Sequence, residues 1–205
     1  VQNYRGIVSF CQPNLKSREE TLKIVLTRTG ANEIHPYNDY RTICGQATAA
    51  KELIEDTGTH LDIIMAPVGG GGLISGTALS AHYFSPGTKI IAAEPENAND
   101  AFLSFKAGYI IPAPSKPQTI ADGLLTSLGN LTFPIIQKHV HEIVTVREDE
   151  IITAMKLIWE RMKLVIEPSA AVAFAAILAK KVNVKGKRVG LILSGGNIDL
   201  QKIPW

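Results

Sequence analysis

The sequence is poor in the features that mark several common classes of protein. Only two cysteines occur in 205 residues, Cys11 and Cys44, and their spacing is not that of a metal or redox motif. The formal net charge is +2, which gives no basic footprint for nucleic acid or for an anionic membrane. The longest apolar run, residues 170–179, is about ten residues long, whereas a membrane-spanning helix needs about twenty. We therefore expect a cytoplasmic protein with reduced thiols, no signal peptide, and neither a nucleic-acid nor a membrane partner.

What the sequence does contain is an alternation of apolar runs and amphipathic segments. Residues 61–68 (LDIIMAPV) form a nearly continuous apolar run, typical of a strand buried on both faces. Strands alternating with helices predict an α/β fold, with an open, mostly parallel sheet and helices on both faces. The other predicted strands are residues 6–10, 89–93, 142–146 and 188–193, and the predicted helices are 17–28, 42–56, 73–84, 101–107, 131–139, 148–162 and 167–180, with Asn14 and Ser17 as candidate N-caps of the first helix.

The first forty or so residues contain a single predicted strand and a single predicted helix. Such a unit is too small to bury a core alone. We expect residues 1–38 to be the C-terminal remnant of a small α/β domain and residues 39–205 to form a large ligand-binding domain.

Four consecutive glycines follow the strand predicted at residues 61–68. Without Cβ atoms, their backbone N–H groups can approach an anion closely, and the helix that follows adds a favourable dipole. The register fits no G-x-G-x-x-G dinucleotide motif, and it fits no nucleotide P-loop because Thr77 stands where a lysine is required. We predict a phosphate-binding loop, with a tight turn lacking any ligand as the alternative. This tetraglycine loop consists of Gly69, Gly70, Gly71 and Gly72.

A second polar loop follows the last predicted strand, in the segment LILSGGN at residues 191–197. Ligands of open parallel sheets bind at the carboxyl ends of the strands, so we expect Ser194 to face the same crevice as the tetraglycine loop. The Ser194 hydroxyl would exchange one hydrogen bond with a ring heteroatom. An ordinary Ser-Gly-Gly turn is the alternative.

Four segments carry a resemblance to a known family. They are GGGGLISG (69–76), ADGLLTSLG (121–129), WERMKLVIEPS (159–169) and LSGGNIDL (193–200). Over essentially its whole length the chain resembles the serine racemases and serine/threonine dehydratases, which are pyridoxal-phosphate (PLP) enzymes of fold type II. The segment WERMKLVIEP is similar to the racemase branch. The resemblance implies PLP as cofactor, an amino acid as substrate, and residues 39–205 as the large PLP-binding domain.

The resemblance assigns cofactor contacts to particular positions. The amides of the tetraglycine loop and of Leu73 would bind the PLP phosphate, Ser194 would face the pyridine nitrogen, and Gly123 would lie against the ring. A hydroxyl at residue 194 cannot hold the ring protonated as a carboxylate would, which favours α-proton removal and β-elimination over transamination. Glu167 would be a carboxylate near the ring edge; its alternative role is a helix N-terminal charge before Pro168.

The resemblance also implies a divalent cation. Glu94, the carbonyl of Ala98, and Asp100 match the family's ligand positions, and oxygen ligands suit Mg²⁺, Mn²⁺ or Ca²⁺. Taken without the resemblance, Glu94 and Asp100 would be solvated loop carboxylates. The family often has two adjacent acids at this point, whereas this chain has Asn99 before Asp100.

Two further sets of positions match the family. Arg18 matches a residue that reaches a distal substrate carboxylate, and Thr126 stands where a serine commonly assists, which keeps 3-hydroxyaspartate among the candidate substrates. Tyr4, Lys163 and Asn197 match positions that line a nucleotide effector site between subunits. The resemblance therefore implies an ATP effector and a homodimer for the full-length protein.

No lysine of this chain stands in the Ser-x-x-Lys-x-Arg-Gly setting of the family's Schiff-base lysine. We therefore expect the chain to lack the N-terminal third of a complete enzyme, to contain no catalytic residue, and to be inactive alone. The complete enzyme would be a PLP-dependent racemase and ammonia-lyase acting on serine, with threonine as a further substrate. A 3-hydroxyaspartate dehydratase and a non-catalytic module that binds a phosphorylated ligand are the alternatives.

Overall fold

The chain divides into two units, Val1–His35 and Pro36–Trp205. The computed structural model describes residues 2–12 and 15–205. The expected boundary lay after residue 38, and the division falls after residue 35.

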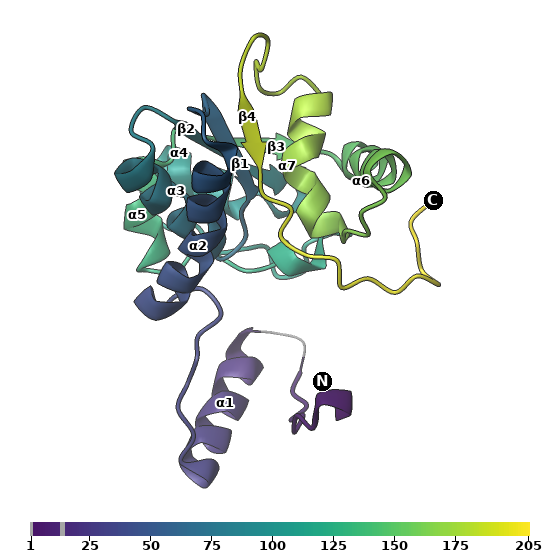
Figure 1. Cartoon of the computed structure of the whole chain (residues 1–205). Coiled ribbons are helices and arrows are strands. Elements are labelled where there is room, and N and C mark those ends of the chain that lie inside the picture. Colours follow the sequence, from purple (N-terminus) through teal and green to yellow (C-terminus); the bar gives the residue numbers. More distant parts are fainter. Residues whose placement is uncertain (1, 13–14) are drawn as a thin grey trace. The chain divides into compact units, whose positions relative to one another are not determined.

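A four-stranded parallel sheet forms the centre of the second unit (Figure 1). Its strands are β1 (Ile63–Pro67), β2 (Lys89–Pro95), β3 (Glu142–Val146) and β4 (Val189–Leu191), in the spatial order β3-β2-β1-β4. The chain runs from β1 outward to β2 and β3, and then returns to place β4 on the other side of β1. This reversal makes the carboxyl ends of β1 and β4 the topological switch point, where ligands of open parallel sheets bind.

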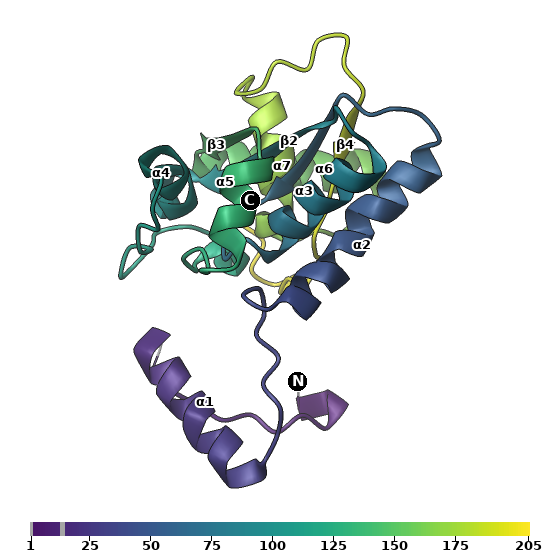
Figure 2. The ribbon, with the colours of Figure 1, turned by 90° about the vertical axis from the view of Figure 1, so that its left-hand side faces the viewer.

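Helices cover both faces of the sheet because alternate residues of each strand point to opposite sides. Ile63 and Met65 of β1 pack in one core with α6 (Glu148–Met162) and α7 (Pro168–Leu178). Ile64 and Ala66 pack in the other core. Figure 2 views the face that is covered by α2 (Tyr40–Thr57), α3 (Gly72–Phe84), α4 (Asp100–Ala107) and α5 (Thr132–His139). The open α/β fold expected from the sequence is confirmed.

Local signals set the ends of several helices. The Asp39 side chain accepts a hydrogen bond from the Arg41 N–H at 2.7 Å and caps α2, which ends at Gly58 with a φ of 60°. At the start of α6 the Arg147 N–H donates to Glu150 Oε2 at 2.8 Å, and the Arg147 guanidinium pairs with Glu150 Oε1 at 2.8 Å. Two short 3₁₀ turns, η2 (Glu96–Ala98) and η3 (Asp122–Leu124), lie in the connections.

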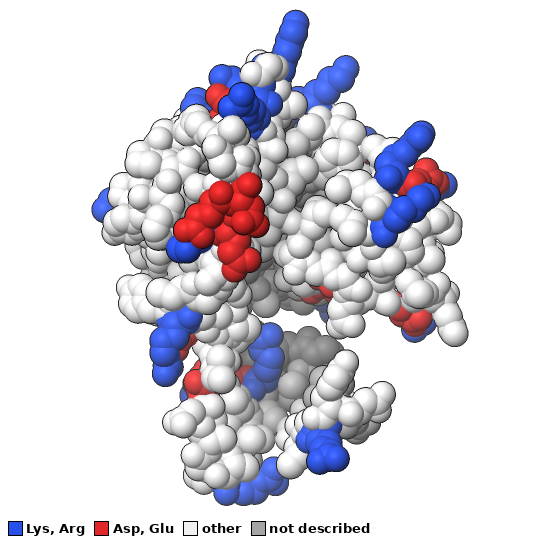
Figure 3. Space-filling view, in the orientation of Figure 1, with Lys and Arg blue, Asp and Glu red and all other residues white. Residues whose placement is uncertain are grey.

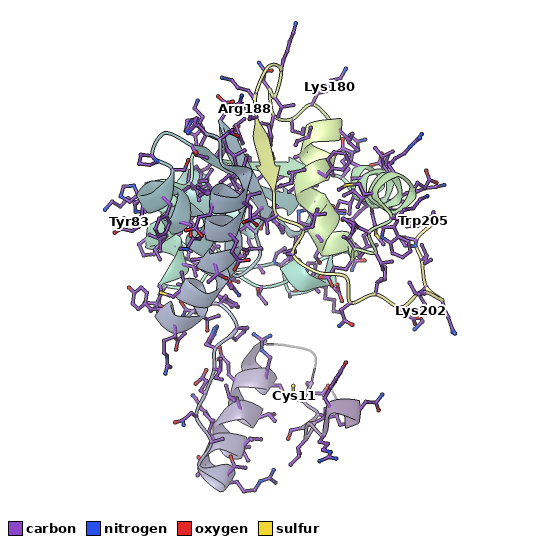
Figure 4. The ribbon with its side chains drawn as sticks, viewed as in Figure 1. Cys11, Tyr83, Lys180, Arg188, Lys202 and Trp205 are labelled. Atoms are coloured by element: carbon purple, nitrogen blue, oxygen red, sulfur yellow. The ribbon has the colours of Figure 1, made fainter. Side chains whose placement is uncertain are left out.

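The C-terminal segment returns to α6 after β4. The ring of Trp205, which is labelled in Figure 4, packs edge-on against that of Trp159 at a centroid distance of 5.3 Å. The Trp159 indole N–H also donates to the Ile166 carbonyl at 2.9 Å. Among the residues described, no helix is long and apolar enough to cross a membrane.

The first unit contains η1 (Gln2–Tyr4) and α1 (Leu15–Thr29). The strand predicted at residues 6–10 is wrong: this segment is irregular, and Ile7 and Phe10 are 94% and 88% exposed. A strand needs a neighbour for its backbone groups, and the described part of this unit offers none. Helix α1 begins before Ser17, whose hydroxyl accepts from the Gln12 N–H at 3.1 Å. The candidate cap Asn14 lies outside the described residues.

Candidate functional site

The tetraglycine loop connects β1 directly to α3 and is buried. Gly71 has a φ of 91°, a conformation that side-chain-bearing residues avoid. A Cβ on Gly71 would lie 2.8 Å from Thr132 Oγ1, and a Cβ on Gly69 would lie 2.9 Å from the Leu124 Cα. Neighbouring atoms therefore lie so close to the backbone of this loop that only glycine fits at these positions.

The N-terminus of α3 is buried, and no side chain of the described residues caps it. The first backbone hydrogen bond of the helix runs from the Ser75 N–H to the Gly71 carbonyl at 3.0 Å. The earlier N–H groups, those of Gly72, Leu73 and Ile74, have no hydrogen-bond acceptor within residues 2–12 and 15–205. N–H donors that lack partners at a helix N-terminus form an anion site, since the helix dipole also favours negative charge there.

The Ser194 loop, residues 194–197, leaves the sheet beside β1. The Ile192 N–H donates to the Met65 carbonyl at 3.0 Å and so extends the pairing of β4 with β1. Ser194 itself is exposed. The carboxyl ends of β1 and β4 are thus neighbours, as the sequence argument required (Figure 1).

Glu167 is bound to the Ser194 loop. Its N–H donates to the Gly195 carbonyl at 3.0 Å, and its Oε2 accepts from the Asn197 N–H at 3.0 Å. Although Glu167 occupies the N-cap position of α7, its side chain makes no capping hydrogen bond. The carboxylate therefore holds the loop and not the end of the helix.

Gly123, in η3, links the two loops. Its N–H donates to the Oγ of the buried Ser169 at 3.0 Å, and the next residue, Leu124, lies against Gly69. A Cβ on Gly123 would lie 3.6 Å from Glu167 Oε1. The structure therefore brings together the tetraglycine loop, Gly123, Glu167 and the Ser194 loop, and the half-buried Thr126 follows η3 along the chain.

Glu94 and Asp100 lie at the carboxyl end of β2, and both are buried, 0% and 1% exposed. The reading of these two residues as solvated loop carboxylates is therefore wrong, because β2 and the helix after it enclose them. Glu94 Oε1 and Oε2 accept the N–H groups of Ala101 and Phe102 at 3.0 and 2.9 Å. Both oxygens of Asp100 lack any hydrogen-bond partner among the described residues, and Ala98 is fully buried.

Burial dominates the titration of these two acids. Loss of water raises the pKa of Glu94 to about 9; the two N–H donors lower it, and the charge of Asp100 raises it further. Burial likewise raises the pKa of Asp100 to about 7. A cation would reverse both shifts by favouring the ionised forms. No group of three or more His, Cys, Asp or Glu side chains gathers around a common point in the described part of the chain.

The remaining predicted positions lie elsewhere. Arg18 in α1 and Tyr4 in η1 belong to the first unit, and both are exposed there. Lys163 ends α6 with a φ of 58°, and its Nζ donates to the Glu160 carbonyl at 2.8 Å. Asn197 contributes its backbone N–H to Glu167, as described above.

Several residues of the site were not predicted from the sequence. Tyr37 lies against Gly70 and Gly72, and Gln46 against Gly72. Asn38 Oδ1 accepts the Leu131 N–H at 2.9 Å. Ser169 falls within WERMKLVIEPS, and Tyr37, Asn38 and Gln46 fall within HPYNDYRTICGQATAA (residues 35–50), which also resembles the family. That resemblance was the available signal for these four residues, whereas Thr132 lies in none of these segments.

The fold and the site define a class of protein: an open parallel α/β protein with an uncapped, anion-accepting helix N-terminus at its switch point. The profile described as "Pyridoxal-phosphate dependent enzyme" matches residues 2–195. The chain belongs to this family.

Relatives agree with this assignment. The chain is 52% identical to a beta-hydroxyaspartate dehydratase from Paracoccus denitrificans, over 100% of this chain and 64% of that protein. It is 47% identical to a serine racemase from Dictyostelium discoideum, over 99% of this chain and 63% of the relative.

Solved structures give the same picture. A crystal structure of the Dictyostelium serine racemase matches with a TM-score of 0.89 and 45% identity, covering 97% of this chain and 64% of that one. The structure of maize serine racemase matches with a TM-score of 0.93 and 41% identity, over 98% and 62% of the two chains. The fold is that of the fold type II PLP enzymes, and the predicted family is confirmed. The chain spans less than two thirds of the length of these relatives.

Proposed function

We propose that this chain is the cofactor-binding part of a PLP-dependent enzyme that racemises and dehydrates hydroxy amino acids, with serine as the principal substrate. One observation carries the proposal. The buried, uncapped N-terminus of α3 lies at the carboxyl end of β1, next to the end of β4 from which the Ser194 loop leaves. A phosphate monoester attached to a nitrogen heterocycle fits this pair of sites.

The residues present fit the cofactor. The N–H groups of the tetraglycine loop and of Leu73 would bind the phosphate, and the Ser194 hydroxyl would hydrogen-bond the pyridine nitrogen. Gly123 would lie against the ring, as the sequence resemblance implies, and Glu167 holds the Ser194 loop in place. Bound PLP supplies an electron sink for the negative charge that develops at the substrate Cα. The Ser194 hydroxyl is neutral, so it stabilises a protonated ring nitrogen less than a negatively charged carboxylate would. A ring that is less protonated suits racemisation and β-elimination.

We also propose a divalent cation, Mg²⁺, Mn²⁺ or Ca²⁺, bound by Glu94, the carbonyl of Ala98, and Asp100. The support is the buried Asp100 carboxylate, both of whose oxygens lack a partner among the described residues. A buried carboxylate in that state is costly unless a cation or a proton satisfies it. Hard oxygen ligands fit these three metals.

The sequence setting of the lysines bears on whether this chain can be active. None of the lysines of this sequence stands in a Ser-x-x-Lys-x-Arg-Gly segment. We therefore propose that the 205-residue chain binds PLP noncovalently and has no turnover. A fluorescence titration with PLP tests binding, and borohydride treatment followed by mass mapping tests for covalent attachment. Absence of PLP binding would refute the proposal, as would stoichiometric fixation of the cofactor on one lysine of this chain accompanied by turnover.

A second candidate activity is dehydration of 3-hydroxyaspartate. The 52% identity to a beta-hydroxyaspartate dehydratase favours it. By the sequence resemblance alone, Arg18 and Thr126 each match a family position that serves the distal carboxylate. If the coding sequence upstream of Val1 contains the lysine segment, the longer protein can be assayed with serine and with 3-hydroxyaspartate. Chiral analysis of the remaining serine separates a racemase from a dehydratase. The absence of a lysine segment would favour a non-catalytic binding module.

The partners proposed are small molecules. On the face in Figure 3, Lys and Arg lie in separate small groups and form no continuous basic surface, which favours an amino-acid substrate over nucleic acid. A cytoplasmic location agrees with the two free cysteines, Cys11 and Cys44. A homodimer and an ATP effector at Tyr4, Lys163 and Asn197 rest on the sequence resemblance.

A further inference from the structure

Thr132 occupies a position in the site that the family resemblance does not assign. It is the first residue of α5 and is fully buried. Its Oγ1 lies 2.8 Å from the Gly70 carbonyl oxygen and accepts the Gly129 N–H at 2.9 Å. A second carbonyl, that of Gly129, is farther away at 3.2 Å, so the single hydroxyl proton goes to Gly70. Thr132 thus links the start of α5 to the tetraglycine loop by a hydrogen bond.

This hydrogen bond determines which way a loop amide points. In a trans peptide the carbonyl and the following N–H lie on opposite sides, and the described chain contains no cis peptide. With the Gly70 carbonyl turned toward Thr132, the Gly71 N–H must point away from α5. Two adjacent glycines offer little resistance to a flip of the peptide plane between them, so an external restraint is needed.

The other end of the loop has its own restraint. The Gly71 carbonyl accepts the Ser75 N–H inside α3. The Gly70 carbonyl accepts the Thr132 hydroxyl at 2.8 Å and, at the longer distance of 3.4 Å, the Gly129 N–H, so the Thr132 hydroxyl is the shorter of two restraints on the Gly70–Gly71 peptide. Thr132 is itself fixed, because its carbonyl accepts the Ser75 hydroxyl at 3.3 Å. The preceding amide, that of Leu131, donates to Asn38 at 2.9 Å.

We propose that Thr132 is a positioning residue for the phosphate cradle: its hydroxyl locks the Gly70–Gly71 peptide so that the Gly71 N–H is presented to a phosphate group. This inference rests on the proposed function, since it assumes that the phosphate of PLP binds at the tetraglycine loop. Thr132 does not touch the cofactor ring or the substrate. Its effect should therefore appear in phosphate binding.

The test compares Thr132→Val, which loses the hydroxyl at similar volume, with Thr132→Ser, which keeps it. Two controls separate binding from stability. Thr77→Val removes a buried hydroxyl of α3 that has no hydrogen-bond partner among the described residues, and Ile151→Val removes one buried methyl group in α6 on the other face of the sheet. Each variant of the 205-residue chain is titrated with PLP and melted without ligand.

Thr132→Val should weaken PLP binding by roughly tenfold to a hundredfold, the usual effect of losing a hydrogen bond to a charged group. Thr132→Ser, Thr77→Val and Ile151→Val should bind within about threefold of the unmodified chain, even where they melt earlier. If Thr132→Val binds PLP as well as the unmodified chain, or no more weakly than Ile151→Val at equal loss of stability, the inference is wrong. If Thr132→Val fails to fold, Thr132→Ala takes its place with the same expected result.

A readout without cofactor separates this inference from the proposed function. In ¹H–¹⁵N spectra of the free chain, the Gly71 amide should give one sharp signal in the unmodified and Ser variants, and a broadened or doubled one in Thr132→Val. A single unchanged Gly71 signal in Thr132→Val overturns the positioning role. Failure of the unmodified chain to bind PLP removes the proposed function and the phosphate role, whatever the spectra show about the peptide lock.

Discussion

Replacing Gly71 by alanine probes two physical costs at once. The residue has a φ of 91°, where a Cβ is disfavoured by roughly 1–2 kcal/mol. The added methyl group would also lie 2.8 Å from Thr132 Oγ1 and 2.9 Å from side-chain atoms of Ile136 and Leu128. These neighbours are buried, so they have little room to move, and such overpacking typically costs about 1–3 kcal/mol.

Two other glycines isolate the conformational part of the cost. Gly58 and Gly108 end α2 and α4 with φ values of 60° and 80°, and a Cβ on either would meet nothing within 4 Å. Alanine at these positions should cost about 1 kcal/mol, because part of the strain is offset by reduced freedom of the unfolded chain. Gly71→Ala should therefore be about 1–3 kcal/mol less stable than either control.

Urea denaturation followed by circular dichroism measures the difference directly, and thermal melts should show a gap of roughly 2–12 °C for a domain of this size. Gly71→Ala should also lose PLP binding, whereas Gly58→Ala and Gly108→Ala should keep it. If Gly71→Ala were no less stable than the two controls, the close packing around the tetraglycine loop would be refuted. Retention of full PLP affinity would refute the assignment of this loop to the phosphate.

Three further predictions test the rest of the site. Burial raises the pKa of Asp100 to about 7, so without a metal its ionisation lowers stability as pH rises from its ordinary value of 3.8 through about 7. Asp100→Asn should make this fall with pH shallower, leaving the part that is due to Glu94, as measured by urea unfolding. The same variant should abolish any rise in melting temperature caused by Mg²⁺; an equal rise in both proteins contradicts the cation site. Glu167→Ala should speed hydrogen exchange of the Asn197 amide by about tenfold or more, whereas Glu167→Gln keeps an acceptor and should retain most of the protection; unchanged exchange in the alanine variant would show that the loop is held otherwise. Burial and the nearby charge of His82 lower the pKa of His139, so the stability that the neutral imidazole contributes is lost as the pH falls below 6.5, the ordinary pKa of histidine. Between about pH 7 and pH 5, His139→Gln should therefore lose less stability than the unmodified chain. Parallel losses would show that His139 is not responsible.

Local pattern was sufficient for much of the second unit. The strand at residues 142–146 and the helix at residues 148–162 were predicted to the residue; the strand ends at Val146, and the hydrogen bond from the Arg147 N–H to Glu150 marks the start of the helix. The strand predicted from the apolar run at residues 61–68 contains β1 (Ile63–Pro67) and extends slightly beyond it at both ends. The predicted strand at residues 6–10 failed because strand formation depends on a partner, and apolar composition does not supply one.

The site was predictable only in its contiguous parts. The tetraglycine loop and the Ser194 loop each follow an apolar strand, so the general rule for parallel sheets located both. The contacts that join them could not be read from the sequence. Gly123 meets Ser169 and Leu131 meets Asn38 across 46 and 93 residues of chain, and each contact depends on how the helices pack. The burial of Glu94 was missed for the same reason.

The two proposed ligand positions lie at the same edge of the sheet, and each contains polar groups without hydrogen-bond partners among the described residues. These groups are N–H donors at one position and carboxylate oxygens at the other. At the end of β1, the first N–H groups of α3 have no acceptor among the described residues, and at the end of β2 the Asp100 oxygens have no donor. Each unpaired buried group costs about 1–3 kcal/mol, so the ligand-free chain is less stable than its packing alone would make it. A phosphate cannot satisfy Asp100, and a cation cannot satisfy the N–H groups of Gly72 and Leu73. The two ligands therefore relieve separate costs, and because they bind the native chain preferentially, their stabilising effects should add.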